Sequence, residues 1–397
     1  MNRTFEYRLY PRHRERRALE TVLEQSREVY NAALTECKNA YESTGQHLSA
    51  IGQWPYFREW RKQPGILLNA SSLQQILRRL DKAYSAFFRR LKAGETPGHP
   101  RHKGDNRFDS VEYTYSDGVK LSFNEREDRF VVYVQNVGDI KVKCHRFLPS
   151  GAEIKQVVIK RKASGWYVCL MLEMPDPLLV EANGLPSVGG DMGLLRLLTL
   201  SDGTLVDNPR WLREALADLR VAQRRLSRRV KGSQGRQAAR LRVAKLHEHV
   251  ANIRRDFWHK VTCWLVHTYG LIALEHLNLS FMTRNLHVSL SAYDAGLGAF
   301  QTLLCYKAVE AGSHVTLVNP AYTSQVCSAC GALVKKDLSV RVHSCSHCHL
   351  ELDRDLNAAI NILNLALNAA WIGPSAANVA ARQGMRRLRS SPSYRGE

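Results

Sequence analysis

Three acidic residues stand where apolar segments begin or end, so their carboxylates are candidates for chemistry. Asp191 precedes a hairpin pattern, Glu275 closes the apolar run of residues 271–274, and Asp355 begins a helical pattern. An ionised carboxylate in an apolar segment is costly to bury unless it is paired or holds a metal ion. Taken singly, the three acids also fit the ordinary roles of a turn residue at a strand end, a paired core carboxylate and a helix N-cap.

The expected direction of its side chain distinguishes Asp355 from its neighbour Asp353. Asp355 shares one helical face with three apolar residues, namely Ala359, Ile362 and Ala366, and we expect it to point toward the sheet that they cover. Asp353 lies off that face. A hairpin, a strand and a helix that each supply one acid, in this order, resemble the RNase H-like arrangement, in which such acids converge on Mg²⁺. Carboxylate oxygens suit this hard cation, and two such ions would activate water and stabilise the leaving oxygen in phosphodiester hydrolysis.

Two CxxC pairs separated by 14 residues are the second chemical signal: Cys327, Cys330, Cys345 and Cys348. Each pair presents two thiolates to one point, which predicts one tetrahedral Zn²⁺, and a complete Cys₄ set makes that zinc structural. Redox-active pairs are the competing interpretation, although no thioredoxin-like βαβ pattern surrounds the cysteines. Three nearby histidines could replace a cysteine ligand: His343, His347 and His349.

Other reaction types lack their sequence markers. The chain has no GxSxG, GxxxxGK[ST] or GxGxxG segment. Acyl transfer, NTP hydrolysis and dinucleotide chemistry are therefore disfavoured. Metal-dependent phosphodiester hydrolysis is the reaction type that the residues favour.

The composition indicates a folded protein with a polyanionic partner. The 397 residues carry a formal net charge of +20, and their 44% hydrophobic content is enough for two or three domains. Lys and Arg displace counterions from phosphates, so nucleic acid is the expected partner. Neither end offers the amphipathic helix or lipidation motif of a membrane-surface protein. No apolar stretch reaches the roughly 18 residues of a membrane span and no secretion signal is present, so we expect a cytoplasmic protein.

The sequence predicts strands in some segments and helices in others as the elements that position the acids. Residues 4–10 alternate as in a half-buried strand, and residues 17–92 have helical periodicity. Residues 93–110 form a basic linker, and residues 111–174 show strand patterns. Because the strand at 4–10 needs partners, we expect it to join this later sheet, which makes the helices an insertion.

Residues 209–260 predict two long amphipathic helices that pack as an antiparallel pair around a turn at Lys231-Gly232-Ser233. The segment holds 15 Lys and Arg against 4 Asp and Glu. Coiled-coil dimerisation is the competing interpretation, yet such one-sided charge would repel itself across a dimer seam. A groove for nucleic acid fits the charge better. We expect the five other cysteines to be buried thiols: Cys37, Cys144, Cys169, Cys263 and Cys305.

Several segments together resemble the TnpB nucleases of bacterial and archaeal insertion sequences, which are relatives of the type V CRISPR effectors. The first five are FEYRLYP at 5–11, PGHPR at 97–101, DMG at 191–193, RDFWHK at 255–260 and ALEHLN at 273–278. The most specific run is YTSQVCSACG at 322–331, followed by the second cysteine pair and DRDLNAA at 353–359. The resemblance covers nearly the whole chain.

The resemblance implies an α/β multidomain architecture. A wedge β-barrel would comprise residues 1–10 and 111–185, and a helical recognition insertion with the basic linker would comprise residues 11–110. An RNase H-like (RuvC) nuclease domain would comprise residues 186–320 and 353–370. It would be interrupted by a zinc ribbon at 321–352 and followed by a basic disordered tail at 371–397.

The resemblance also implies RNA guidance and assigns the metal ligands. A transposon-derived guide RNA would pair with one strand of a target double-stranded DNA after the protein reads a short adjacent motif, and the heteroduplex would lie in a basic channel. The family's acids carry over onto Asp191, Glu275 and Asp355 as catalytic ligands of two Mg²⁺ ions, beside the structural Zn²⁺. Three departures leave these ligands in place: Gly190 and Met192 where Ile and Leu are commoner, and His276 where Asp is usual.

The expected function is therefore RNA-guided DNA endonuclease, with two alternatives. One is an RNA-guided DNA-binding regulator that does not cut, which the three retained acids disfavour. The other is a transposase that joins DNA strands, because that chemistry also uses RNase H-like acids. The sequence leaves the guide sequence, the target-adjacent motif with its base-reading residues, and the oligomeric state open.

Overall fold

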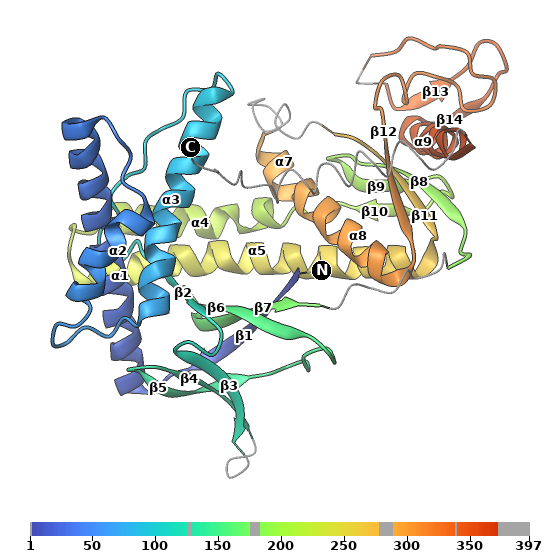
Figure 1. Cartoon of the computed structure of the whole chain (residues 1–397). Coiled ribbons are helices and arrows are strands. Elements are labelled where there is room, and N and C mark those ends of the chain that lie inside the picture. Colours follow the sequence, from blue (N-terminus) through green and yellow to red (C-terminus); the bar gives the residue numbers. More distant parts are fainter. Residues whose placement is uncertain (1, 125–128, 175–182, 278–288, 338–339, 372–397) are drawn as a thin grey trace, which may run out of the picture. The chain divides into compact units, whose positions relative to one another are not determined.

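The amino-terminal strand pairs with strands that follow the helices. In the computed structural model, which describes residues 2–124, 129–174, 183–277, 289–337 and 340–371, the chain forms two compact units, Met1–Pro177 and Leu178–Glu397 (Figure 1). Strand β1 (Asn2–Tyr10) runs antiparallel to β5 (Gly138–Lys143) and β7 (Gly165–Glu173). The expectation that this strand joins the later sheet is confirmed.

The sheet of the first unit has seven antiparallel strands in the order β2-β6-β7-β1-β5-β4-β3. The strands not yet introduced are β2 (Ser110–Thr114), β3 (Val119–Asn124), β4 (Arg129–Val134) and β6 (Glu153–Lys162). Strands β2 and β3 end the order on its two sides, and no pairing between them occurs in the described residues. The described part of the expected wedge β-barrel is therefore a curled antiparallel sheet with two edges.

Three helices share one hydrophobic core with this sheet. They are α1 (His13–Thr44), α2 (Ala50–Trp60) and α3 (Ala70–Lys92), which lie between β1 and β2 in the sequence. Helix α3 buries Leu73, Ile76 and Leu80, and its start is capped by Asn69, whose side-chain oxygen accepts the backbone N–H of Ser72 at 2.8 Å. The predicted insertion therefore packs on the sheet rather than standing apart from it.

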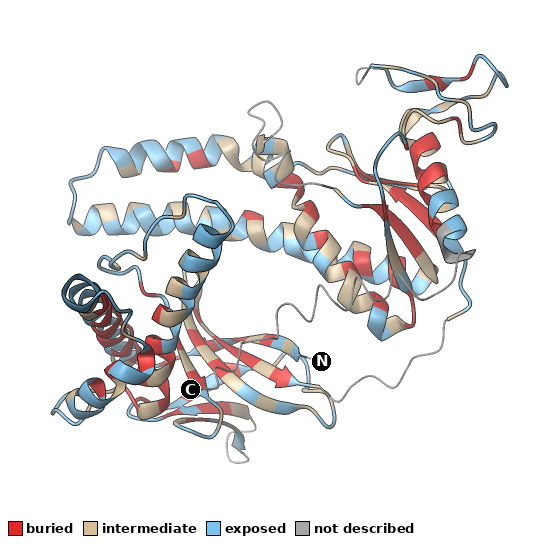
Figure 2. Ribbon diagram, turned by 45° about the horizontal axis from the view of Figure 1, so that its top comes forward, coloured by how far each residue is buried: buried red, intermediate tan, exposed pale blue. Residues whose placement is uncertain are grey.

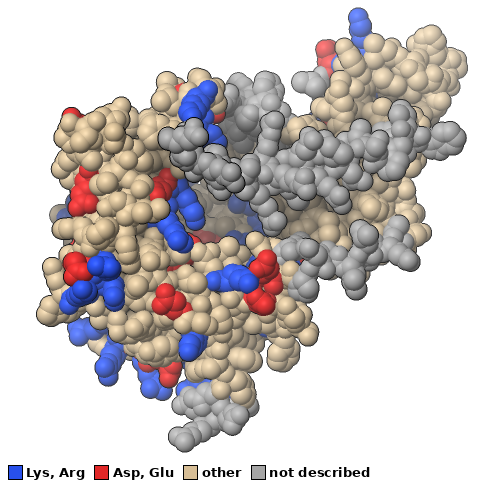
Figure 3. All heavy atoms as spheres, viewed as in Figure 1, with Lys and Arg blue, Asp and Glu red and all other residues tan. Residues whose placement is uncertain are grey.

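Opposite charges alternate on the surface of the first unit. On the face in Figure 3, Lys and Arg side chains lie beside Asp and Glu over its helices and sheet. Glu6 pairs with both Lys160 and Lys162, and these contacts, against the opposing effect of burial, lower the pKa of Glu6 to about 2. Lys160 and Lys162 are therefore held in ion pairs with an acid of the same sheet.

The second unit is built on a mixed five-stranded sheet in the order β10-β9-β8-β11-β12. Strands β8 (Ser187–Asp191), β9 (Arg196–Leu200) and β10 (Leu205–Asp207) form an antiparallel meander. Strand β11 (Leu271–Glu275) then runs parallel to β8, and β12 (His314–Val318) runs parallel to β11. The order of hairpin and later strand is the one that the sequence predicts.

Helices cover both faces of this sheet. Helices α5 (Gln234–Thr268) and α8 (Leu297–Ala311) supply Trp258 and Phe300 to a core with β8, β9 and β11, and the short helix α7 (Ser289–Ala295) precedes α8. Helix α9 (Arg354–Trp371) packs on the other face and turns its buried residues toward the strands (Figure 2). The buried positions include Ala359 and Ile362, so the helical face predicted for α9 is confirmed.

Gly189 allows α9 to approach β8 closely. A Cβ atom added at this glycine would lie 2.1 Å from the carbonyl oxygen of Ala359 and 2.7 Å from the backbone nitrogen of Leu363, both in α9. These are backbone atoms, which cannot turn aside as a side chain can. Any larger residue at position 189 must therefore push the helix away from the sheet.

The basic segment between β10 and β11 is a helical hairpin, as predicted. Helix α4 (Trp211–Ser227) packs against α5, and Gly232 in the turn has a φ of +86°, a conformation that favours glycine. Arg236 donates to the carbonyl oxygens of Leu226 and Arg229 and so ties the two helices together near this turn.

Three further expectations have separate outcomes. Among the described residues, no helix combines the length and apolarity needed to span a bilayer. Cys37 and Cys169 are buried as expected, but Cys263 is exposed on α5, so that prediction is wrong for this thiol, which lies on a side of the helix that faces outward. The predicted tail from 371 falls almost entirely on residues 372–397, outside the described part of the chain.

Replacing Gly189 by alanine should destabilise the second unit. The added methyl group forces α9 outward, and overpacking of this kind costs about 1–3 kcal/mol of unfolding free energy. Thermal or urea unfolding measures the effect. Gly235→Ala in α5 is the matched control, because its Cβ would meet only the flexible Arg229 side chain, at 3.6 Å, and alanine favours a helix. Equal stability of the two variants would contradict the packing described for α9.

Candidate active site

Two of the candidate acids lie at the same end of adjacent strands. In the parallel pair β8 and β11, Gly190 is the register partner of Leu274, and Asp191 and Glu275 are the next residues along their strands. Side chains alternate across a strand, so Asp191 lies on the face of Gly189, which α9 covers. Glu275 likewise shares the face of Ala273, which packs against α9.

Asp355 reaches the same place from the first turn of α9. Its neighbour Asp353 has a different role, because an oxygen of Asp353 accepts the backbone N–H of Asp355 at 2.9 Å and so caps the helix, while Arg196 donates to its other oxygen at 3.1 Å. The sequence-based distinction between the two aspartates therefore agrees with the structure.

All three predicted acids line a single cavity of about 620 Å³ in the second unit. Five arginines line it as well: Arg196, Arg210, Arg213, Arg341 and Arg354. A space of this size, lined by both carboxylates and guanidinium groups, could hold a phosphodiester and its counter-cations.

Burial and mutual repulsion perturb the carboxylates. Burial, followed by the charges of Glu275 and Asp355, raises the pKa of Asp191 to about 7. Burial also raises the pKa of Glu275, against a hydrogen bond from Thr323 that lowers it. Two carboxyls at adjacent strand ends thus resist ionisation, as expected for a site that needs a cation to balance it.

Asp355 is held by arginines. Arg354 donates to Oδ1 of Asp355 at 3.0 and 3.1 Å, and Arg341 lies 3.8 Å from Oδ2. Among the described residues, only the four cysteines bring their ligand atoms within 4.8 Å of one another, so the three carboxylates are spaced more widely. Their donor set of carboxylate oxygens nevertheless suits a hard divalent cation rather than zinc.

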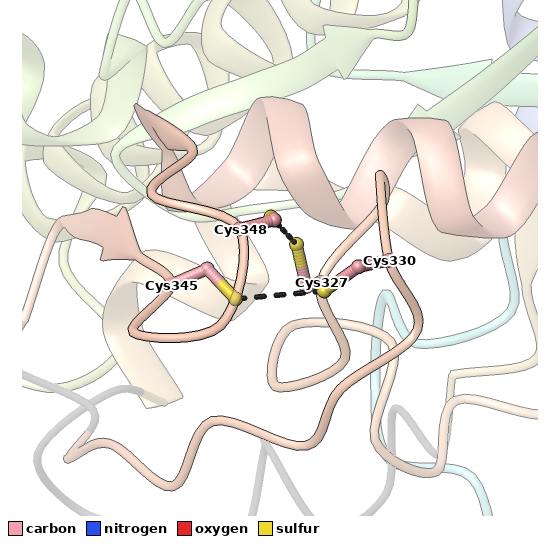
Figure 4. Close-up of side chains that lie close together, drawn as sticks. All are labelled: Cys327, Cys330, Cys345 and Cys348. Carbon is pink, nitrogen blue, oxygen red and sulfur yellow. Dashed lines mark hydrogen bonds between the residues drawn. The ribbon is translucent and has the colours of Figure 1, made fainter.

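The four predicted cysteines form a cluster next to α9. Cys327 and Cys330 lie in one loop and Cys345 and Cys348 in another, with the sulfur atoms turned toward one another (Figure 4). The Sγ atoms of Cys327 and Cys348 are 3.5 Å apart, and those of Cys330 and Cys345 are 3.6 Å apart. Four thiolates at about 2.3 Å from one tetrahedral Zn²⁺ would be about 3.8 Å apart. The cluster therefore fits a structural zinc ion.

The loop backbone also favours thiolates. Backbone N–H groups of Cys348 and His347 lower the pKa of Cys345 to about 6. A small hairpin of β13 (Val342–Ser344) and β14 (Glu351–Asp353) closes the second loop. None of the three nearby histidines joins the cluster in the described residues, and buried His343 contacts Lys336 instead.

Buried polar residues around the acids carry roles that the sequence reasoning missed. Thr323 donates to Glu275, and Asn357 and Asn361 of α9 bond to the chain just before and after Cys327. Asp294 lines the cavity, but its Oδ1 accepts the backbone N–H of Leu212 at 3.0 Å and so caps α4. The one available signal was the polarity of two residues, Asn357 and Asn361, on the apolar face of a helix.

The α4 and α5 hairpin offers a second charged surface. Its exposed basic residues include Arg220, Arg224, Arg228, Arg240, Arg242 and Lys245. Only the aromatic and aliphatic stripe, including Leu219 and Val250, is buried between the helices. The surface suits a polyanion, as predicted.

Three family models match parts of the chain. "Cas12f1-like, TNB domain" matches residues 298–362, "Probable transposase" matches 169–286 and "Helix-turn-helix domain" matches 1–46. The first match contains the four cysteines and Asp355, and the second contains the other two acids. The third covers β1 and α1 of the structure.

Relatives of similar length are named as RNA-guided DNA endonucleases. One from Streptomyces pristinaespiralis is 32% identical over 94% of this chain and 91% of its own. InsQ of Escherichia coli K12 is 30% identical over 90% of this chain and 91% of its own. Cas12f1 of Sulfoacidibacillus thermotolerans, named as a CRISPR-associated endodeoxyribonuclease, is 23% identical over 74% of this chain and 76% of its own.

Solved structures share the fold. Cas12f1 in a complex with single guide RNA and target DNA aligns with a TM-score of 0.61 at 14% identity, over 92% of this chain and 99% of that chain. The mini-RNA-guided endonuclease Cas_phi3 aligns with a TM-score of 0.53 at 10% identity, over 92% of each chain. The chain therefore has the architecture of these effector proteins.

The cysteine cluster should hold one zinc ion per chain. Cys330→Ser removes one of four thiolate ligands, so zinc that remains after dialysis should fall well below one equivalent, as measured by mass spectrometry of the metal. Cys263→Ser, at the exposed thiol of α5, should leave the zinc content unchanged. Full retention of zinc by Cys330→Ser would contradict the four-cysteine site, and an unchanged protein that purifies without zinc would indicate redox pairs instead.

Replacing the Asp191 carboxylate by a neutral side chain should stabilise the metal-free protein more at high pH than at low pH. The folded pKa of about 7 lies above the ordinary value of 3.8, so the native state binds more protons than the unfolded chain between these values. Stability therefore falls as pH rises through this window. Asp191→Asn should raise the unfolding free energy by about 1–3 kcal/mol more at pH 8 than at pH 5.

The matched control for this measurement is Asp207→Asn, an exposed carboxylate at the end of β10 on the same sheet. It should change stability little, and equally, at the two pH values. If Asp191→Asn raises the unfolding free energy equally at pH 5 and pH 8, the carboxylate at the end of β8 is not destabilised by burial and by its acidic neighbours.

Proposed function

This chain belongs to the TnpB family of RNA-guided DNA endonucleases, and from that premise we propose that it is an insertion-sequence nuclease that cuts double-stranded DNA where a bound guide RNA directs it. The observation that carries the proposal is the convergence of Asp191, Glu275 and Asp355 on one cavity beside a zinc-binding ribbon. The meander, parallel strand and helix that supply these acids support a RuvC-type nuclease of the RNase H-like class.

We assign Asp191, Glu275 and Asp355 as the ligands of two Mg²⁺ ions. When bound, such ions would supply an activated water and stabilise the leaving oxygen of phosphodiester hydrolysis. Asp191 and Glu275 present their oxygens from the fixed ends of the sheet, and Asp355 presents its own from the helix. Asp191 must lose its proton to serve as a ligand, and the positive charge in the site favours that loss.

The arginines in the cavity have a complementary task. Arg341 and Arg354 lie against Asp355 and also line the space that a DNA strand would enter. Guanidinium groups bind phosphate through charge-assisted hydrogen bonds. They would hold the phosphate backbone of the DNA strand beside the acids, while a carboxylate binds the metal ion.

The partners proposed are a transposon-derived guide RNA and the target DNA duplex. The exposed arginines of α4 and α5 supply a surface for nucleic-acid backbone, and paired residues such as Lys160 and Lys162 would contribute less. The domain limits also remain part of this proposal. They are the wedge (1–10 and 111–185), the insertion (11–110), the nuclease domain (186–320 and 353–370), the ribbon (321–352) and the tail (371–397). We place its action in the cytoplasm of a bacterium or archaeon.

Neither alternative function gains support from the site. A regulator that binds without cutting has no need of three carboxylates that line one cavity, of which Asp191 and Glu275 have raised pKa values. A strand-joining transposase would use the same acids, but the relatives that cover most of this chain are named as RNA-guided endonucleases.

Programmed cleavage tests the proposal. The RNA that copurifies with the protein is sequenced, its guide segment is replaced, and plasmids carrying the matching target with randomised flanks are incubated with the complex. Double-strand cleavage next to one short flanking motif should require Mg²⁺. Asp191→Ala should reduce the rate about 1,000-fold, equivalent to about 4 kcal/mol of lost transition-state stabilisation.

Asp207→Ala, which removes an exposed carboxylate from the same sheet, should cut like the unchanged protein. Binding of the target without cleavage by the unchanged protein would favour the regulator. Joining of DNA strands by the protein alone would favour the transposase.

A further inference from the structure

The hydroxyl of Thr323 lies against the carboxylate of Glu275. Thr323 is 4% exposed and its Oγ1 donates to Oε1 of Glu275, while the carbonyl oxygen of Pro320 lies 3.1 Å from the same hydroxyl. A hydroxyl has one proton, so it donates to one of these acceptors at a time, and the charged carboxylate is the stronger. Since Glu275 is itself only 7% exposed, this bond sets which way its oxygens face.

Two asparagines of α9 hold Thr323 in place. The side-chain amide of Asn361 donates to the carbonyl oxygens of Thr323 at 2.8 Å and Val326 at 2.7 Å. Asn357 donates to the same Val326 oxygen at 2.8 Å and accepts the backbone N–H of Ser328 at 2.9 Å. Buried amides cost stability unless they are bonded, so this pairing fixes the chain at 323–328 firmly on the helix.

This fixed segment joins three parts of the protein. Cys327 of the cysteine cluster lies within it, and its first residue contacts Glu275. Asp355 lies two residues before Asn357 on the helix to which the segment is bonded. We propose that Thr323 is a positioning residue of the nuclease site, through which the zinc-bound loop orients Glu275 relative to Asp355. The inference rests on the proposed function, because it concerns the same acids.

If Thr323 had only a structural role, its variants would affect metal binding differently. Thr323→Val keeps the shape and removes the hydroxyl, and Thr323→Ser keeps the hydroxyl. Thr262 provides the matched control, because it is a fully buried threonine of α5 whose hydroxyl donates to the backbone oxygen of Trp258 at 2.6 Å and contacts no acid. If Thr323 only fills space, both valine variants should affect the metal site equally.

The experiment measures Mn²⁺ affinity by electron paramagnetic resonance, with the full chain carrying its zinc and its copurified RNA. For each variant, binding by the same variant with Asp191→Asn added is subtracted, which removes ions held by the RNA. Loss of a hydrogen bond to a metal ligand weakens metal binding about 10-fold to 100-fold. Thr323→Val should therefore raise the Mn²⁺ dissociation constant about tenfold, and Thr323→Ser and Thr262→Val should stay within about twofold.

Equal affinities for Thr323→Val and Thr262→Val would overturn the proposal, as would a serine variant as weak as the valine variant. If Thr323→Val does not fold, Thr323→Ala carries the same comparison without a methyl group against the carboxylate. A protein that binds Mn²⁺ at this site but does not cut its target contradicts the proposed function, while the affinity ratio still decides the role of Thr323. Failure of the unchanged protein to bind Mn²⁺ contradicts both.

Discussion

Parallel pairing of β8 with β11 places two carboxylates side by side, and the remainder of the second unit compensates for the repulsion between them. Asp191 and Glu275 directly follow the last residues paired between β8 and β11, on one face of the sheet. Burial and like charge raise the pKa of Asp191 to about 7, which means that the site in isolation prefers a proton to a negative charge. A cation reverses that preference, so the same geometry that strains the metal-free protein favours metal binding.

Asp355, the third acid, is positioned by the close packing of α9 on the sheet rather than by a strand of the sheet. Helix α9 can lie against β8 because Gly189 has no side chain, and this contact brings the start of the helix to the strand ends. The zinc ribbon then returns the chain to α9, where Asn357 and Asn361 bond to the loop that contains Cys327. Sheet, helix and cysteine loops are thus joined by direct contacts, and a zinc ion held by four cysteines would have no open position for chemistry.

Sequence patterns predicted the elements and the direction of the acids well. The alternation in 4–10, the helical face that includes Asp355 and the two cysteine pairs each follow from a local period or spacing. The burial expected of Cys263 was wrong, because which side of a helix faces outward depends on tertiary packing. Tertiary packing also decides how far the curled sheet forms the expected wedge barrel. Thr323 and Asn361 were missed as well. A threonine near a turn resembles an ordinary cap, and an asparagine inside a helix reveals its partner only when the fold is known.

Guidance by RNA rests on the family to which the chain belongs, while the metal chemistry rests on residues whose positions the structure supplies. The most direct test of this account is anomalous diffraction from a crystal of the protein with guide RNA, target DNA and Mn²⁺. Two manganese peaks between Asp191, Glu275 and Asp355, in contact with a phosphate of the target strand, are the predicted result. A target strand bound elsewhere, with no manganese on these acids, would contradict it.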